Sequence, residues 1–171
     1  MFIEIEPRIS RIIRKLCNLG LKIIPKNSIR EILTSRVYTY IYCCIGDRVH
    51  SYEELFKDIE PYGEMILDVG VGPGKIYRTK YEKSNVIIGV DFSLEMLKKL
   101  KDSKPEAQVI LAEGRYLPFV SDSFDISVAN EVLKYSDEPQ RIVEEMKRVS
   151  RKKVIYTEGF IISRRKVVDI E

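Results

Sequence analysis

Apolar residues recur at helical spacing in the first quarter of the chain. Between Arg8 and Leu19 they fall every three or four positions, with arginine and lysine on the opposite face. A second helical pattern runs from Ser28 to Ile45, and Gly46 supplies a stop signal. We expect two amphipathic helices here, and we interpret the basic face of the first as the solvated side of a helix that packs on its own domain.

A third, short helix is predicted before Pro61. Ser51 is followed three residues later by Glu54, which together form a capping box. In such a box the serine oxygen and the glutamate carboxylate satisfy backbone N–H groups at the start of a helix. We expect this helix to run to Pro61.

After Gly63 the pattern changes to short β-rich runs separated by helical ones. Strands that alternate with helices form parallel sheets, so the pattern predicts an α/β fold. We expect a three-layer αβα sandwich with a mostly parallel, doubly wound sheet. The predicted strands are Met65 to Val69, Val86 to Val90, Gln108 to Leu111, Phe124 to Ala129 and Val154 to Thr157, and the predicted helices lie near Lys75 to Glu82, Leu94 to Lys101 and Pro139 to Val149.

Composition limits the class of protein. A chain of 171 residues with 44% hydrophobic residues is expected to fold around one core. With 32% charged residues of both signs and a net charge of +3, nothing indicates disorder, a membrane-embedded chain or a strongly basic nucleic-acid binder. We therefore expect a single domain, 1–171, in which an N-terminal helical extension (1–62) caps an α/β core (63–171).

The cysteines and the amino end indicate the cellular compartment. Cys17, Cys43 and Cys44 form no C-x-x-C pair, so neither a disulfide framework nor a metal site is indicated. Glu4 and Glu6 interrupt the apolar residues at the amino end, and no signal-peptide run follows. We interpret the cysteines as buried thiols and expect a cytoplasmic protein.

A glycine-rich segment, ILDVGVGPGK, carries the first chemical signal. Its strand ends with Asp68, and three glycines follow, Gly70, Gly72 and Gly74. Glycines allow a sharp turn with a ligand against the backbone. The dinucleotide fingerprint would need glycine where Lys75 stands, and an acid before the first glycine suits a ligand that carries a cation.

Asp91 is the second signal. It ends the run VIIGVD, where a carboxylate can accept hydrogen bonds from both hydroxyls of a ribose. Ser93 is placed to cap the helix that follows. Because many nucleotide-binding folds share this acid, it supports a nucleotide ligand without identifying it.

The segment from Asp68 to Gly74, DVGVGPG, resembles the first motif of class I S-adenosylmethionine-dependent methyltransferases. The segment AEGRYLPFVSDSFDIS, Ala112 to Ser127, resembles the one after strand three in their ubiquinone-type, small-molecule branch. The similarity runs from Glu64 to Tyr156 in the family's order and spacing. It implies a Rossmann-like core, S-adenosylmethionine as cofactor and transfer of a methyl group to an unidentified acceptor, most simply a small molecule.

The resemblance also implies roles for individual residues. Glu113 would hold the adenine amino group, and the backbone N–H of Gly114 would meet the adenine ring. Arg115 departs from the acidic or polar residue usual at its position. The full set of expected cofactor-binding residues is Asp68, Gly70, Gly72, Gly74, Asp91, Phe92, Glu113, Gly114 and Asn130.

The acceptor is expected over the carboxyl ends of strands four and five, beside Asn130 to Tyr135. If a general base is needed, Glu131 and Tyr135 are candidates, and His50 is the only histidine. Asn130 opens no Asn-Pro-Pro-Tyr motif and no Pro-Cys follows, which disfavours methylation of adenine or glutamine nitrogens and of cytosine carbon.

The carboxyl end departs from the family, whose members usually continue through a helix and a two-stranded hairpin. Only Glu158 to Glu171 remain here, so we expect truncated C-terminal strands. Ile161, Ile162, Val167 and Val168 indicate one further strand. An open sheet edge favours pairing with another chain, which predicts a homodimer or a partner protein.

Two other functions remain open at this point. One is a non-catalytic subunit or sensor that binds the cofactor. The other is an RNA-modifying methyltransferase that uses the basic first helix and the Arg164 to Lys166 cluster against phosphates. A dehydrogenase is disfavoured by the glycine spacing.

Overall fold

The structure is a computed structural model that describes Thr39 and residues 52–158 and 164–170. All the elements below belong to the compact unit His50–Glu171. The two helices predicted in the N-terminal part, the three cysteines, His50 and Ser51 lie outside the described residues, except that Thr39, in the second predicted helix, is helical.

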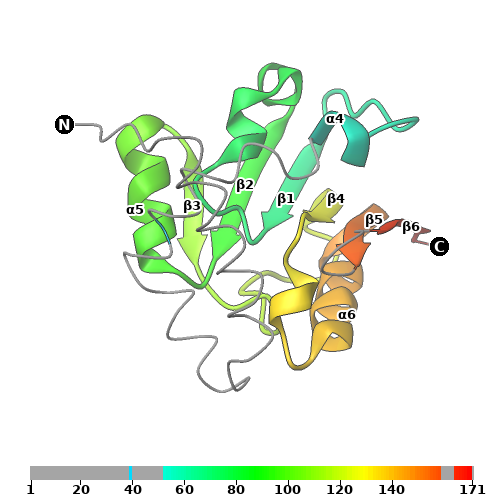
Figure 1. Ribbon diagram of the computed structural model, residues 1–171. Coiled ribbons are helices and arrows are strands. Elements are labelled where there is room, and N and C mark those ends of the chain that lie inside the picture. The colour runs from blue at the N-terminus through cyan, green and yellow to red at the C-terminus, as the bar shows by residue number, and fades with distance from the viewer. Residues whose placement is uncertain (1–38, 40–51, 159–163, 171) are drawn as a thin grey trace, which may run out of the picture. The chain divides into compact units, whose positions relative to one another are not determined.

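One six-stranded sheet forms the centre of the fold (Figure 1). Its strands lie in the order β3-β2-β1-β4-β5-β6, and β6 alone is antiparallel to its neighbour. The mostly parallel sheet is therefore confirmed, and so is a further C-terminal strand. The strands are β1 (Met65–Val69), β2 (Val86–Asp91), β3 (Gln108–Leu111), β4 (Phe124–Ala129), β5 (Ser150–Glu158) and β6 (Arg164–Asp169).

Helices lie on both faces of the sheet, and two of them, α5 and α6, lie where the sequence predicts them. Ser93 caps α5 by accepting a hydrogen bond from the Met96 N–H, as expected, and Pro139 opens α6. The helical elements are α4 (Tyr52–Leu55), η2 (Lys75–Arg78), η3 (Lys80–Lys83), α5 (Leu94–Ser103), η4 (Leu133–Tyr135) and α6 (Pro139–Val149).

Two predicted helices are wrong in form or length. The one expected near Lys75 to Glu82 is a pair of 3₁₀ helices interrupted by Thr79, whose backbone is extended and whose hydroxyl bonds to Ile76 and Tyr81. The one expected to reach Pro61 ends at Leu55, because the chain turns through left-handed residues after it.

The last parallel strand is longer than predicted. It begins at Ser150, directly after α6, instead of at Val154. The buried Ser150 hydroxyl lies 2.6 Å from the Ser127 hydroxyl of β4 and donates to the Met146 carbonyl of α6, which ties the helix end to the strand start. The charged residues that follow Ser150 hid this part of the strand from a hydrophobic pattern.

Alternate residues of the strands feed two separate cores. Ile66 packs with Phe56, Ile76 and Leu100 on the side of α4, η2 and α5. Leu67, its neighbour, packs on the opposite side in the core that contains Met146 of α6. This alternation produces the predicted three-layer arrangement.

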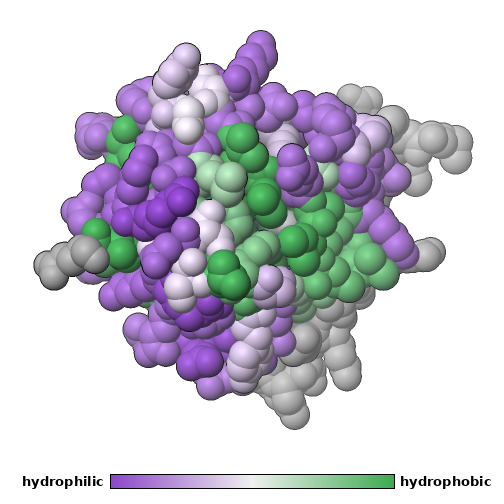
Figure 2. Space-filling model, turned by 180° about the vertical axis from the view of Figure 1, so that it is seen from behind, coloured by the Kyte–Doolittle hydropathy of each residue, from purple (hydrophilic) through white to green (hydrophobic). Residues whose placement is uncertain are grey.

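Some apolar side chains of β2 and β3 are exposed. Val86, Ile110 and Leu111 are 49%, 36% and 53% exposed. Figure 2, the view from behind, shows apolar residues gathered in one area of the surface, with hydrophilic surface above them. No helix among the described residues is long and apolar enough to cross a membrane, and no cluster of potential metal ligands occurs in the same part of the chain.

The strand order fixes where a ligand can bind. From β1 the chain moves outward to β2 and β3, and then returns to place β4 on the other side of β1. In open parallel sheets, ligands bind at this reversal, outside the carboxyl ends of the strands. The loops after β1, β2, β3 and β4 therefore define the region to search for a site.

Candidate functional site

The loop after β1 is built from three glycines with left-handed backbones. Gly70, Gly72 and Gly74 have φ angles of 74°, 54° and 81°. A β-carbon on Gly70 would lie 2.3 Å from a methyl carbon of Val132, and one on Gly74 would lie 2.2 Å from a methyl carbon of Leu100. Glycine is required both by the turn and by close packing against α5 and the loop after β4.

Asp91, the last residue of β2, is buried and fixed by backbone donors. The Gly72 N–H donates to Oδ2 over 2.9 Å, and the Ser93 N–H donates to Oδ1 over 2.8 Å. Burial raises the pKa of Asp91, while hydrogen bonds from Ser93, Gly72 and Phe92 limit the rise. A carboxylate offers about four acceptor positions, so these backbone donors leave it capacity to accept from a ligand hydroxyl.

Asp68 lies on β1 and is fully buried. The Tyr52 hydroxyl donates to its Oδ2 over 2.6 Å, and its Oδ1 has no hydrogen-bond partner in the part of the chain that the structure describes. Burial raises the pKa of Asp68 to about 8; the Tyr52 bond opposes this rise, and the nearby Asp91 adds to it. An unsatisfied buried carboxyl is costly and marks this position as a place for a ligand donor.

The loop after β3 holds the expected adenine-side residues. Glu113 is half-buried and is engaged by Arg115, whose Nε donates to Oε1 over 2.5 Å. Arg115 also pairs with Asp137 and Glu138, which precede α6. A β-carbon on Gly114 would lie 3.0 Å from Val69, so this loop also packs closely on the end of β1. The departure at Arg115 therefore serves to tie two loops together.

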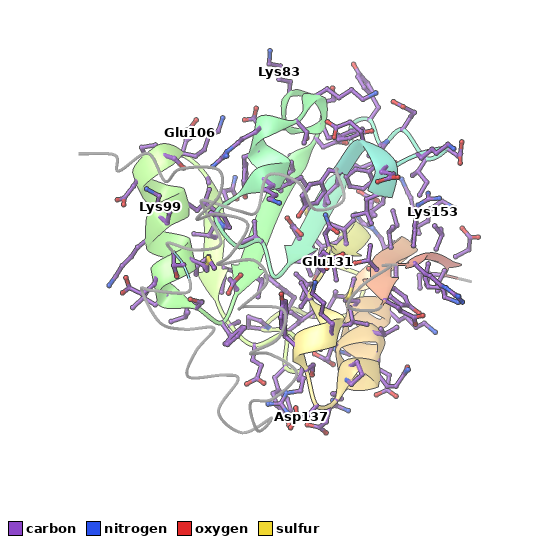
Figure 3. The ribbon with its side chains drawn as sticks, viewed as in Figure 1. Lys83, Lys99, Glu106, Glu131, Asp137 and Lys153 are labelled. Atoms are coloured by element: carbon purple, nitrogen blue, oxygen red, sulfur yellow. The ribbon has the colours of Figure 1, made fainter. Side chains whose placement is uncertain are left out.

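Residues after β4 form the side expected for the acceptor. Glu131 has a left-handed backbone, with φ of 63°, and its N–H donates to Thr157 Oγ1 over 2.7 Å. Its buried carboxylate pairs with Lys134, whose Nζ lies 5.0 Å from the ring centre of Tyr135. Figure 3 shows Glu131 beside the carboxyl end of β1. Such backbone strain in a non-glycine residue is typical of functional sites.

Most of the predicted residues converge at the carboxyl ends of the strands. Asp91 bonds to the glycine loop, and Gly70 contacts the loop after β4 through Val132. Asn130 is half-buried at the start of that loop. Sequence reasoning missed Tyr52 and Thr157, whose hydrogen bonds link positions 16 and 26 residues apart. No local pattern signals such contacts.

The sequence around this site matches the model of a known protein family. The family model for the methyltransferase domain matches residues 67–156, which contain the glycine loop, Asp91 and the loop after β4. The chain belongs to the methyltransferase domain family. The resemblance stated from the sequence is thereby confirmed.

Several relatives of this methyltransferase domain are known. An uncharacterized protein of Methanocaldococcus jannaschii is 38% identical over 86 residues, which are 50% of this chain and 39% of the relative. Malonyl-[acyl-carrier protein] O-methyltransferase of Hamiltonella defensa is 27% identical over 125 residues, 66% of this chain and 48% of the relative. Demethylmenaquinone methyltransferase of Paenarthrobacter aurescens is 34% identical over 89 residues, 52% of this chain and 35% of the relative. The chain thus spans half or less of the length of these relatives.

Solved structures agree on the fold of the methyltransferase domain. A chain from the complex between the Haloferax volcanii Trm112 methyltransferase activator and a methyltransferase superposes with a TM-score of 0.65 at 20% identity, covering 76% of this chain and 60% of that one. Magnesium protoporphyrin IX methyltransferase of Synechocystis, solved with bound S-adenosylmethionine, gives 0.62 at 14% identity, covering 81% and 78%. Both confirm the Rossmann-like core.

Proposed function

We propose that the chain binds S-adenosylmethionine and transfers its methyl group to a small-molecule acceptor. The observation that carries the proposal is the Asp91 carboxylate, which Gly72 and Ser93 fix at the end of β2 beside the glycine loop. The names of the malonyl-[acyl-carrier protein] and demethylmenaquinone relatives support the activity and the class of acceptor.

The residues at the carboxyl ends of the strands fit the parts of such a cofactor. Asp91 would accept the two ribose hydroxyls, and the buried, unsatisfied Oδ1 of Asp68 would accept from the ammonium group of the amino-acid half. Glu113 and the Gly114 N–H would meet the adenine. Phe92 and Asn130 complete the set that we assign to the cofactor, together with the three glycines of the loop after β1.

The cofactor supplies a methyl group on a sulfonium, which is already activated for in-line displacement. The chain therefore has to bind, orient and exclude water, and alignment alone contributes roughly 7 to 11 kcal/mol to lowering the barrier. Glu131 is our candidate to accept a proton from the acceptor, because its carboxylate is buried at the reversal point of the sheet. Tyr135 is the second candidate.

Isothermal titration with S-adenosylmethionine and S-adenosylhomocysteine tests the proposal. We expect micromolar binding by the wild type and a loss of at least about 100-fold in Asp91→Asn, since two charge-assisted hydrogen bonds to ribose are weakened together. Asp125→Asn is the matched control, because Asp125 is a partly buried acid at the opposite end of the sheet. Equal affinity of the wild type and Asp91→Asn would refute the assignment.

A panel of acceptors separates the remaining functions. Methyl transfer to a small molecule supports the proposal, whereas cofactor binding without turnover favours a non-catalytic subunit. Transfer to RNA, with a steep dependence on salt, favours the RNA-modifying alternative.

We also propose a homodimer or a partner protein at the β6 edge of the sheet, and action in the cytoplasm. Among the described strands, β6 pairs only with β5, and its Val167 is 38% exposed. The structural neighbour from the Trm112 complex supports assembly with another chain. Light scattering that shows a monomer at high concentration would refute self-association.

A further inference from the structure

Tyr52 and Asp68 form a buried hydrogen-bonded pair between α4 and β1. The Tyr52 side chain is 4% exposed and Asp68 is inaccessible. The hydroxyl donates to only one carboxyl oxygen, Oδ2, so the pair leaves Oδ1 buried and unsatisfied by the described residues. Tyr52 lies upstream of the matched family segment, which begins at residue 67.

Among the described residues, the groups that face Asp68 include no cation. They are Tyr52 from α4, Tyr77 from η2 and Asp91 from β2. Tyr77 uses its own hydroxyl for the carbonyls of Ile87 and Gln108. No lysine or arginine of the described ranges forms an ion pair with Asp68. A buried carboxyl without a cation is held in its neutral form, and a cationic ligand group reverses that preference.

Asp68 and Asp91 lie on the same face of the sheet. Asp68 is in register with Gly89 of β2, and Asp91 follows two residues later, so both side chains project to the same side. Asp91 raises the pKa of Asp68 through its charge. The ribose site and the site for a cation therefore adjoin.

We propose that Tyr52 is a positioning residue, which holds Asp68 so that Oδ1 receives the ammonium group of the cofactor's amino-acid half as the Asp68 carboxyl gives up its proton. This inference rests on the proposed function and deepens it. The O–H bond of the carboxyl breaks, the proton passes to the buffer, and the carboxylate remains paired with the ammonium and with the Tyr52 hydroxyl. Binding is thereby coupled to the release of one proton.

The support of α4 fits this role. Arg165 of β6 donates through Nε to the Leu55 carbonyl over 2.7 Å and through Nη2 to the Lys57 carbonyl over 2.5 Å. These bonds satisfy carbonyls at the end of a helix of four residues that has little stability of its own. The C-terminal strand thus fixes the element that carries Tyr52.

Two ligands separate the ammonium from the rest of the cofactor. S-adenosylhomocysteine carries the amino-acid half, whereas 5′-deoxy-5′-methylthioadenosine keeps adenine and ribose but lacks it. Titration at pH 7 in buffers of different ionisation enthalpy counts the protons released. We expect the wild type to release close to one proton with S-adenosylhomocysteine and none with the thioadenosine.

Tyr52→Phe removes the hydroxyl and keeps the ring. We expect it to weaken S-adenosylhomocysteine about tenfold and to leave the thioadenosine within about twofold, because only the charged half depends on Asp68. Tyr77→Phe removes another buried hydroxyl near Asp68 that does not bond to it, and we expect no such split between the ligands.

Each outcome separates the two proposals. A wild type that binds both ligands without releasing a proton, or a Tyr52→Phe variant that weakens both equally, overturns the role of Tyr52 and leaves the proposed function standing. Failure of the folded wild type to bind either ligand overturns both.

Discussion

Acidic residues lie in opposite environments at the two ends of the central sheet. At the amino ends of the strands, Asp125 and Glu64 pair with the exposed side chains of Arg151 and Lys152. At the carboxyl ends, Asp68 and Asp91 are buried and form no ion pair with any residue in the described part of the chain. Pairs of the first kind contribute little and are easily replaced. Buried acids of the second kind cost stability, which the fold tolerates where a ligand supplies the missing partner.

Two glycines extend the comparison to the backbone. Gly63, at the amino end, has φ of 69°, and a β-carbon there would meet nothing within 4 Å. Gly70, at the carboxyl end, has φ of 74°, and its β-carbon would collide with Val132. Both substitutions to alanine strain the backbone, but only one also overfills a packed site.

Of the substitutions compared at a single pH, Gly70→Ala should have the largest effect on stability. We expect a loss of about 3 kcal/mol in the free energy of unfolding, from left-handed strain and overpacking together. Gly63→Ala, the control, should lose about 1 kcal/mol from strain alone. Urea denaturation measures both values. Val132→Ala in the Gly70→Ala background should restore part of the loss, and equal losses in the two single variants would show that the close approach to Val132 is unimportant.

The pH dependence of stability should run in opposite directions at the two ends. Burial raises the pKa of Asp68 from 3.8 to about 8, so the folded state binds the proton more tightly than the unfolded state. The stabilisation that protonated Asp68 provides is complete below the pKa of the unfolded chain, 3.8. It is lost as the pH rises through the folded pKa of about 8. We expect the wild type to lose about 1 kcal/mol per pH unit relative to Asp68→Asn within this window.

Asp125 provides the opposite sign. Burial raises its pKa, but the Met65 N–H, Arg151 and Lys152 outweigh burial and lower it below 3.8. Its stabilisation is present at neutral pH and is lost as the pH falls through the folded value. Urea denaturation of Asp125→Asn across the acid range should therefore show the wild type losing its advantage at low pH.

A constant difference between wild type and Asp68→Asn from pH 4 to 8 would contradict the burial of an uncompensated acid.

Local signals explain which parts of this site could be predicted from sequence. The glycine loop and Asp91 follow apolar strands directly, so their place at the carboxyl end of the sheet follows from pattern and spacing. The Glu131 N–H, in contrast, donates to Thr157, and the Asp68 carboxyl accepts from Tyr52. These partners come from distant parts of the chain, and nothing in their own neighbourhood marks them.

The same reasoning explains why one helix and the start of one strand were predicted wrongly. Thr79 broke a predicted helix because its side chain competes for backbone groups, a tendency that apolar spacing does not record. The strand from Ser150 was underestimated because its first residues are charged, and Arg151 and Lys152 pair with Asp125 of the neighbouring strand β4.

The smallest expected effect concerns how the C-terminal strand supports the buried end of the sheet. Arg165→Ala removes two hydrogen bonds to the carbonyls that follow Tyr52, and we expect a loss of about 1 kcal/mol in the free energy of unfolding. Arg164→Ala, an exposed position on the same strand, should lose less than about 0.5 kcal/mol. If α4 is held in place by Arg165, the alanine variant should also bind S-adenosylhomocysteine about two- to threefold more weakly, with the affinity for the thioadenosine unchanged. A stability loss without this split between ligands would mean that β6 stabilises the fold but does not position Tyr52 toward Asp68.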